Sequence, residues 1–107
     1  GHAQTAPVAV SSSGGTLAAN MTESNVFTST LTENVATLTL TGAAQGQTVN
    51  MLFTQDATGS RTMAWPAAFK WPGGTAETLS TNANAVDLLV ITYLGTSWYA
   101  SMLKDLS

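Results

Sequence analysis

Hydrophobic and polar residues alternate along most of this chain. In the run V-A-T-L-T-L-T at 35–41, alanine and leucine alternate with threonine, which would place the apolar side chains on one face of a strand and the hydroxyls on the other. A helix would set Leu38 and Leu40 about 200° apart, so the run predicts a β-strand. Similar patterns predict further extended segments at 8–11, 16–21, 26–31, 47–54, 61–65, 86–94 and 97–103.

Turn-forming residues separate these segments. The connection centred on Asp56 and Gly59 is expected to join 47–54 and 61–65 into an antiparallel hairpin. No segment shows a convincing helical period, and turn signals recur about every ten residues. The predicted fold class is therefore all-β, an antiparallel and jelly-roll-like β-sandwich of about eight short strands.

The run V-D-L-L-V-I-T-Y-L at 86–94 is apolar on both faces apart from Asp87 and Thr92. A strand of this kind lies centrally in a sheet covered on both sides, or at a contact between subunits. A carboxylate in such a strand needs a partner. We expect Asp87 to pair with Arg61 or Lys70.

The 107 residues are enough for one domain and too few for two. We expect residues 1–15 to be a tag remnant, Gly1-His2, followed by a flexible leader with an edge strand at 8–11. A single β-sandwich domain is expected over 16–107. The sequence S-S-S-G-G at 11–15 supplies the break between the two parts.

Charged residues make up only 8% of the chain, whereas 18 residues are threonine and 10 are serine. The net charge is −3 with three Lys and Arg residues, which disfavours a nucleic-acid partner because phosphate binding needs several cationic contacts. No apolar run approaches the roughly 18 residues of a membrane-spanning helix, so membrane insertion is not expected. There is no cysteine, which excludes disulfides and thiolate metal sites.

Catalytic chemistry has little support in the sequence. The single histidine, His2, belongs to the suspected tag, so neither Ser-His nor Cys-His arrangements are available. The carboxylates are dispersed, and Asp56 is read as a turn-forming residue rather than a calcium ligand. We therefore expect no enzymatic activity, no metal site and no cofactor.

The segment 54–74 concentrates unusual residues, including two of the three tryptophans and two of the three prolines. Trp65 and Trp71 each precede a proline, which favours extended backbone, and Gly73-Gly74 predicts a turn. With Trp98 and Tyr99 these tryptophans would suit a platform for stacking sugar rings. In the alternative interpretation Trp65 and Trp98 are core residues and Trp71 closes one end of the sandwich. The candidate binding residues are Trp71, Trp65 and Tyr99.

The motifs G-S-R-T-M-A-W-P and K-W-P-G-G, followed by V-D and by G-T-S-W-Y, resemble a module found near the C-terminal ends of bacteriophage virion proteins. These are chiefly tail-fibre, tail-spike and other minor structural proteins. The resemblance extends roughly over 16–103. The matching residues are Gln55, Asp56, Gly59, Arg61, Trp65, Pro66, Trp71, Pro72, Gly73, Gly74, Asp87, Gly95, Trp98 and Tyr99.

The resemblance implies a virion component assembled in the host cytoplasm, either a receptor-binding tail-fibre tip or a capsid decoration. It also implies other virion subunits or a host-surface glycan as partners, and a homo-oligomer such as a trimer. No catalytic residues come with it. A carbohydrate-binding β-sandwich module is the alternative. We interpret the following residues as the structural signature of the module: Asp56, Arg61, Trp65, Trp71, Gly73, Gly74, Asp87 and Trp98.

Overall fold

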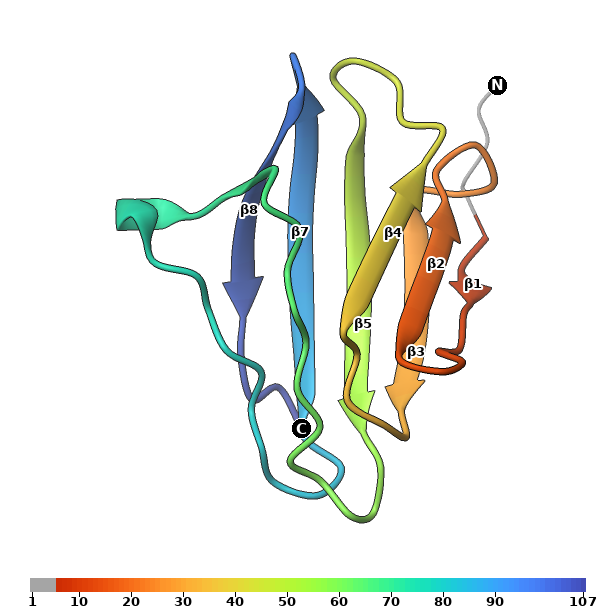
Figure 1. Cartoon of the computed structure of the whole chain (residues 1–107), viewed down its shortest axis with the longest axis vertical. Helices are drawn as coiled ribbons and strands as arrows, with labels where there is room; N and C mark the ends of the chain where they lie inside the picture. The colour runs from red at the N-terminus through yellow and green to blue at the C-terminus, as the bar shows by residue number, and fades with distance from the viewer. Residues whose placement is uncertain (1–5) are drawn as a thin grey trace.

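Two β-sheets form the protein in a computed structural model that describes residues 6–107 (Figure 1). The larger sheet has the strand order β1-β3-β5-β7-β8-β6 and the smaller one pairs β2 with β4. The strands are β1 (Val8–Ala9), β2 (Thr16–Asn20), β3 (Val26–Leu31), β4 (Thr37–Thr41), β5 (Thr48–Gln55), β6 (Phe69–Lys70), β7 (Val86–Leu94) and β8 (Ser97–Leu103). The only helical element in the described part is a 3-10 turn, η1 (Pro72–Gly74). The prediction of a β-rich fold is confirmed.

The strand pairing is mixed, so the prediction of a purely antiparallel sandwich is wrong and a jelly-roll arrangement is not confirmed. β1, β3 and β5 run parallel, as do β2 with β4 and β6 with β8; only β5–β7 and β7–β8 are antiparallel. From β2 to β5 the chain reverses at each turn and changes sheet each time (Figure 1). The neighbours among these strands, β2 with β4 and β3 with β5, are therefore two strands apart in the chain and point the same way.

The expected hairpin of 47–54 with 61–65 is also wrong. β5 instead lies between β3 and β7. The segment after it crosses to the smaller sheet, where the amide of Val35 donates to the carbonyl of Thr62 (2.8 Å) and the amide of Ala64 donates to the carbonyl of Val35 (2.9 Å). Gly59 and Ser60, with φ of 74° and 60°, turn the chain away from β5.

Gly59 has a second role because the chain passes very close to it. A Cβ at this position would lie 2.6 Å from the carbonyl oxygen of Thr81 and 2.9 Å from the amide nitrogen of Ala83. Both are backbone atoms, so glycine lets two loops at this end of the molecule touch.

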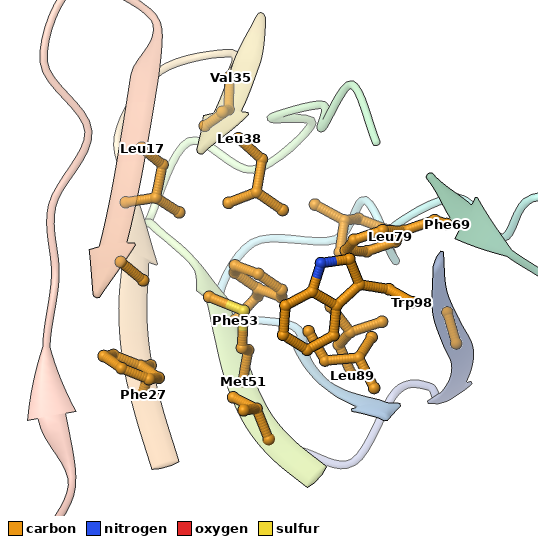
Figure 2. Packing of buried hydrophobic residues seen from close by; sticks show 14 of the residues in the cluster. Leu17, Phe27, Val35, Leu38, Met51, Phe53, Phe69, Leu79, Leu89 and Trp98 are labelled. Carbon is orange, nitrogen blue, oxygen red and sulfur yellow. The ribbon is translucent and has the colours of Figure 1, made fainter. Parts of the chain in front are cut away.

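Alternation decides which side chains enter the core. On β5, Val49, Met51 and Phe53 are buried between the layers, as the pattern predicts. The core continues through residues of both sheets and of the loops, which Figure 2 shows converging from several elements. Its members are Leu17, Ala19, Met21, Phe27, Leu31, Val35, Leu38, Val49, Met51, Phe53, Phe69, Leu79, Leu89, Ile91, Trp98 and Ala100.

β1 forms the outer strand of the larger sheet beside β3. The suspected tag, Gly1-His2, lies outside the described residues, and the domain boundary at residue 16 stays a prediction. Within residues 6–107, no helix is long and apolar enough to cross a membrane.

Candidate functional site

The tryptophan-rich segment forms an aromatic cluster over the β7 and β8 half of the larger sheet. The ring of Trp65 lies 6.0 Å from that of Phe53, 5.8 Å from that of Phe69 and 5.3 Å from that of Trp71, between ring centres. The indole nitrogen of Trp65 donates to the carbonyl of Glu77 (2.7 Å). Trp65 is therefore held on several sides, with its polar atom paired.

Proline and glycine set the path of the chain past Trp71. Trp71 has φ −106° and ψ 152°, the extended backbone expected before a proline. Gly73 and Gly74 then adopt φ of 67° and 75°, and the amide of Gly74 donates back to the carbonyl of Trp71 (2.9 Å). The predicted glycine turn is confirmed, and it carries η1 outward from the body of the molecule (Figure 1).

The short strand β6 brings this segment beside β8. It pairs in parallel, with Phe69 opposite Trp98 and Lys70 opposite Tyr99. Because side chains alternate along a strand, Phe69 turns into the core while Lys70 is exposed. Tyr99 is also exposed, at 53% of its surface.

An open groove of about 400 Å³ lies between these two strands. Its walls combine aromatic, aliphatic and hydroxyl groups with one ammonium. Lys70, Trp71, Pro72, Tyr99, Ala100 and Ser101 line it. Such a surface can stack a flat apolar face and donate hydrogen bonds at its rim.

Trp98 belongs to the core rather than to this groove. Only 5% of its surface is exposed, and its ring lies 4.8 Å from that of Tyr93. Figure 2 shows it pointing toward Leu89 and Phe53. This position agrees with the core interpretation of Trp98, so of the four aromatic candidates Trp71 and Tyr99 reach the groove.

Asp56 and Arg61 form an ion pair, with Arg61 Nη2 2.9 Å from Asp56 Oδ2. Asp56 Oδ1 also accepts from the amides of Thr58 (3.1 Å) and Gly59 (3.0 Å), as a turn-forming aspartate does. The hydrogen bond from Arg61, helped by these amides, lowers the pKa of Asp56. In the described part of the chain, no group of three or more His, Cys, Asp or Glu side chains could hold a metal ion.

The expected pairing of Asp87 with Arg61 or Lys70 is wrong. Asp87 is buried, with 2% of its surface exposed. Its carboxylate accepts from the amide and hydroxyl of Ser80 (2.6 and 2.8 Å) and from the amide of Asp105 (2.8 Å). Donors from a loop and from the C-terminal segment thus satisfy the buried carboxylate, which was expected to pair with a cation.

Among protein families, a model described as "Putative phage tail fibre C-terminal domain" matches residues 13–98. The chain belongs to this family of tail fibre domains. No curated protein and no solved structure matches the chain. Family membership makes this tail fibre domain part of a phage virion, with a structural role in association with other virion components.

The family match includes one wall of the groove and excludes the other. Lys70, Trp71 and Pro72 lie within residues 13–98, whereas Tyr99 and Ser101 follow the matched range directly. The groove of this tail fibre domain is therefore built from the tryptophan-rich segment and from the strand at which the match ends.

Sequence reasoning missed Lys70 and Ser101 as groove residues and did not foresee the role of Gln55. Alternation along 97–103 already placed Ser101 on the face of Tyr99, which was a usable signal. Gln55 is buried, donates to the carbonyls of Arg61 (2.9 Å) and Ser80 (3.0 Å), and accepts from the amide of Arg61 (3.0 Å). No sequence pattern marks these long-range contacts.

Proposed function

We propose that this domain is the host-contacting part of a tail fibre, and that the groove between Trp71 and Tyr99 binds a saccharide of the host surface. In this proposal the domain binds without catalysis. The observation that carries the proposal is the open groove of about 400 Å³ with two aromatic side chains in its walls. The family description supports the fibre setting over a capsid decoration.

The groove is suited to a sugar because a pyranose ring has both an apolar face and a rim of hydroxyls. The ring of Trp71 or Tyr99 offers a flat apolar surface for the former. The hydroxyls of Tyr99 and Ser101 and the ammonium of Lys70 offer hydrogen-bond partners for the latter. Few polar groups in a mainly apolar groove are the usual composition of a ligand site.

Trp65 supports this site from behind. Its ring packs against that of Trp71 at 5.3 Å while its indole nitrogen is already paired with Glu77. Trp71 is thus held before a ligand arrives, which reduces the ordering cost of binding. We assign Trp71 and Tyr99 to ligand contact and Trp65 to positioning of Trp71.

Binding to an array of bacterial lipopolysaccharide, capsular and teichoic-acid glycans tests the proposal. We expect the domain to bind a subset of these glycans. Trp71→Ala and Tyr99→Ala should each weaken this binding by about tenfold or more, since stacking of one nucleobase on an aromatic side chain, a comparable contact, is worth about 1–3 kcal/mol. Leu106→Ala is the matched control, because Leu106 is 51% exposed and outside the groove. The proposal would be contradicted if the wild-type domain bound no glycan, or if both aromatic variants bound as tightly as the wild type.

The domain also acts, in our proposal, as a homo-oligomer, with a trimer as one form. Association with other virion components follows from the family.

A further inference from the structure

Lys70 is the one charged side chain in the walls of the groove, within residues 6–107 that the structure describes. The other lining residues are aromatic, aliphatic or hydroxyl-bearing. Lys70 is exposed and is opposite Tyr99 in the parallel pairing of β6 with β8. Residues opposite each other on neighbouring strands direct their side chains to the same face of the sheet. The ammonium of Lys70 therefore lies on the same side of the groove as the ring of Tyr99.

Lys70 is also the one basic side chain without a carboxylate partner in the described part of the chain. Of the other two, Arg61 pairs with Asp56 at 2.9 Å, and Lys104 Nζ lies 3.9 Å from Glu77 Oε1. The residues outside the described part include no Asp or Glu. An acidic group of a ligand can therefore pair with Lys70 without displacing a carboxylate of the protein.

The backbone of β8 places a hydrogen-bond acceptor in the same groove. The amide of Trp98 donates to the carbonyl of Ala68 (2.9 Å), on the edge of β8 that faces away from β7. Backbone groups alternate between the two edges of a strand, so Ala100 directs its carbonyl to the edge that Trp98 uses. Continued pairing would bring this carbonyl to Pro72, which has no N–H to donate. The carbonyl of Ala100, a groove residue, is thus left to accept from a ligand.

We propose that the groove selects saccharides that carry an acidic group, a carboxylate or a phosphate, and that Lys70 recognises this group. The inference names the ligand class of the groove and rests on the proposed function. The anionic group pairs with Lys70, the sugar ring lies against Tyr99 or Trp71, and a ring hydroxyl donates to the carbonyl of Ala100.

The charge of the whole domain makes this recognition local. The net charge is −3, so an anionic polymer gains no attraction from the domain as a whole and gains it at the unpaired cation. A single ion pair at an exposed site is weak and is screened by salt. The inference therefore predicts a preference of about threefold to fivefold for acidic saccharides, which declines as salt is added.

Binding to matched pairs of polysaccharides tests the inference. One pair is a uronic-acid polymer and its carboxyl-reduced form, and the other is a phosphate-bearing polymer and its dephosphorylated form, with the acidic polymers taken from those that the wild type binds on the array. At about 20 mM salt the wild type should bind an acidic polymer about threefold to fivefold more tightly than its neutral form. The difference should shrink at about 500 mM salt. The pair that shows it identifies the carboxylate or the phosphate as the recognised group.

Variants of the two exposed lysines assign the preference to one residue. Lys70→Gln should abolish the preference, whereas Lys70→Arg should retain it because the charge is kept. Lys104→Gln is the matched control, since it also changes the net charge from −3 to −4 but lies outside the groove. It should bind like wild type. Equal melting temperatures of the variants check that each one is folded.

The outcomes separate this inference from the proposed function. A wild-type domain that binds only neutral glycans, or binds the acidic and neutral forms of each pair equally, overturns the inference and leaves saccharide binding in place. Equal losses in Lys70→Gln and Lys104→Gln overturn it as well, because the preference would then depend on overall charge. A wild-type domain that binds no glycan contradicts the proposed function, and the inference is overturned with it.

Discussion

The two halves of the inner face of the larger sheet are covered in different ways. Over β3 and β5 lies a regular second sheet, in which β2 and β4 pair along five residues (Figure 1). Over β7 and β8 lies irregular chain from 61 to 85, with β6 and η1 as its only short elements. We refer to these as the sheet-covered half and the loop-covered half.

The core of the sheet-covered half is built mainly from apolar side chains that alternate along its strands. Leu17 and Leu38 enter the core from the covering strands, and Phe27 and Met51 meet them from below (Figure 2). β2 and β4 pair in parallel register from Thr16 with Thr37 to Asn20 with Thr41, so their facing backbone groups bond to each other and need no buried side chain.

The loop-covered half needs polar anchors because irregular backbone cannot pair with itself. Gln55 bonds to the backbone of Arg61 and Ser80, Asp87 to that of Ser80 and Asp105, and Trp65 to that of Glu77. Because the covering segment does not follow a regular strand path, it can form one wall of the groove at Trp71. Candidate function is thus found where the cover is irregular and the scaffold below is rigid.

Truncation of one leucine in each half measures this difference most directly. Leu17→Ala should cost about 3–5 kcal/mol of unfolding free energy, because Leu17 is fully buried and a paired strand cannot collapse into the cavity. Leu79→Ala, in a loop, should cost nearer 2 kcal/mol because its backbone can relax. Urea unfolding of both variants gives the values. An equal or larger loss for Leu79→Ala would show that the loop is as rigid as the sheet.

Replacement of the buried anchor Asp87 tests the polar attachment of the loops. Asp87→Asn substitutes an amide NH₂ for one acceptor oxygen and leaves a buried donor facing another donor. We expect a loss of about 1–3 kcal/mol, measured by urea unfolding, with faster hydrogen exchange at the amides of Ser80 and Asp105.

Asp105→Asn is the control for this variant, because Asp105 contributes its backbone amide to the anchor rather than its carboxylate. It should leave the unfolding free energy close to that of wild type. If Asp87→Asn were as stable as the control, the anchor would not hold the loops.

The smallest expected effect concerns pH and compares one surface carboxylate in each half. Asp56 pairs with Arg61 in the loop-covered half, and Glu33 accepts from the amide of Gly15 beside the smaller sheet (2.9 Å). These hydrogen bonds, from Arg61 and from Gly15 respectively, lower the pKa of each carboxyl. The stabilisation is therefore fully present above the ordinary pKa values of 3.8 and 4.5, and it declines as pH falls through the lowered ones.

Thermal unfolding of Asp56→Asn and Glu33→Gln from neutral pH downward gives the measurement. Each variant should be slightly less stable than wild type at neutral pH, and the difference should shrink below about pH 4. A difference that persists unchanged into acid would assign the effect to packing rather than to charge.

Most strands and their inward faces were predictable from the sequence, whereas the pairing of strands was not. The expected strand at 61–65 does not form, and the short strand β6 was not expected. Alternation identified β5 and the burial of Val49, Met51 and Phe53. It could not show that β5 would pair with β3 and β7 instead of with 61–65, because a turn signal marks a reversal and not the sheet to which the chain returns. The same limit produced the wrong partner for Asp87, whose donors lie 7 and 18 residues away in irregular chain.

The groove was predictable in part. Trp71 and Tyr99 were candidates, but the parallel pairing of β6 with β8 sets them beside Lys70 and Ser101. Trp65 was a candidate too, and its place behind Trp71 depends on the packing of Phe53 from β5 against the rings of Trp65, Phe69 and Trp71.

By itself the sequence determined the β-rich class, most strand positions, the buried face of each long strand and the family, because these depend on local periodicity and short motifs. The tertiary structure decided which strands pair, what satisfies Asp87 and Gln55, and which aromatic rings reach solvent. These features arise from contacts between segments far apart in the chain, and no pattern of neighbouring residues encodes them.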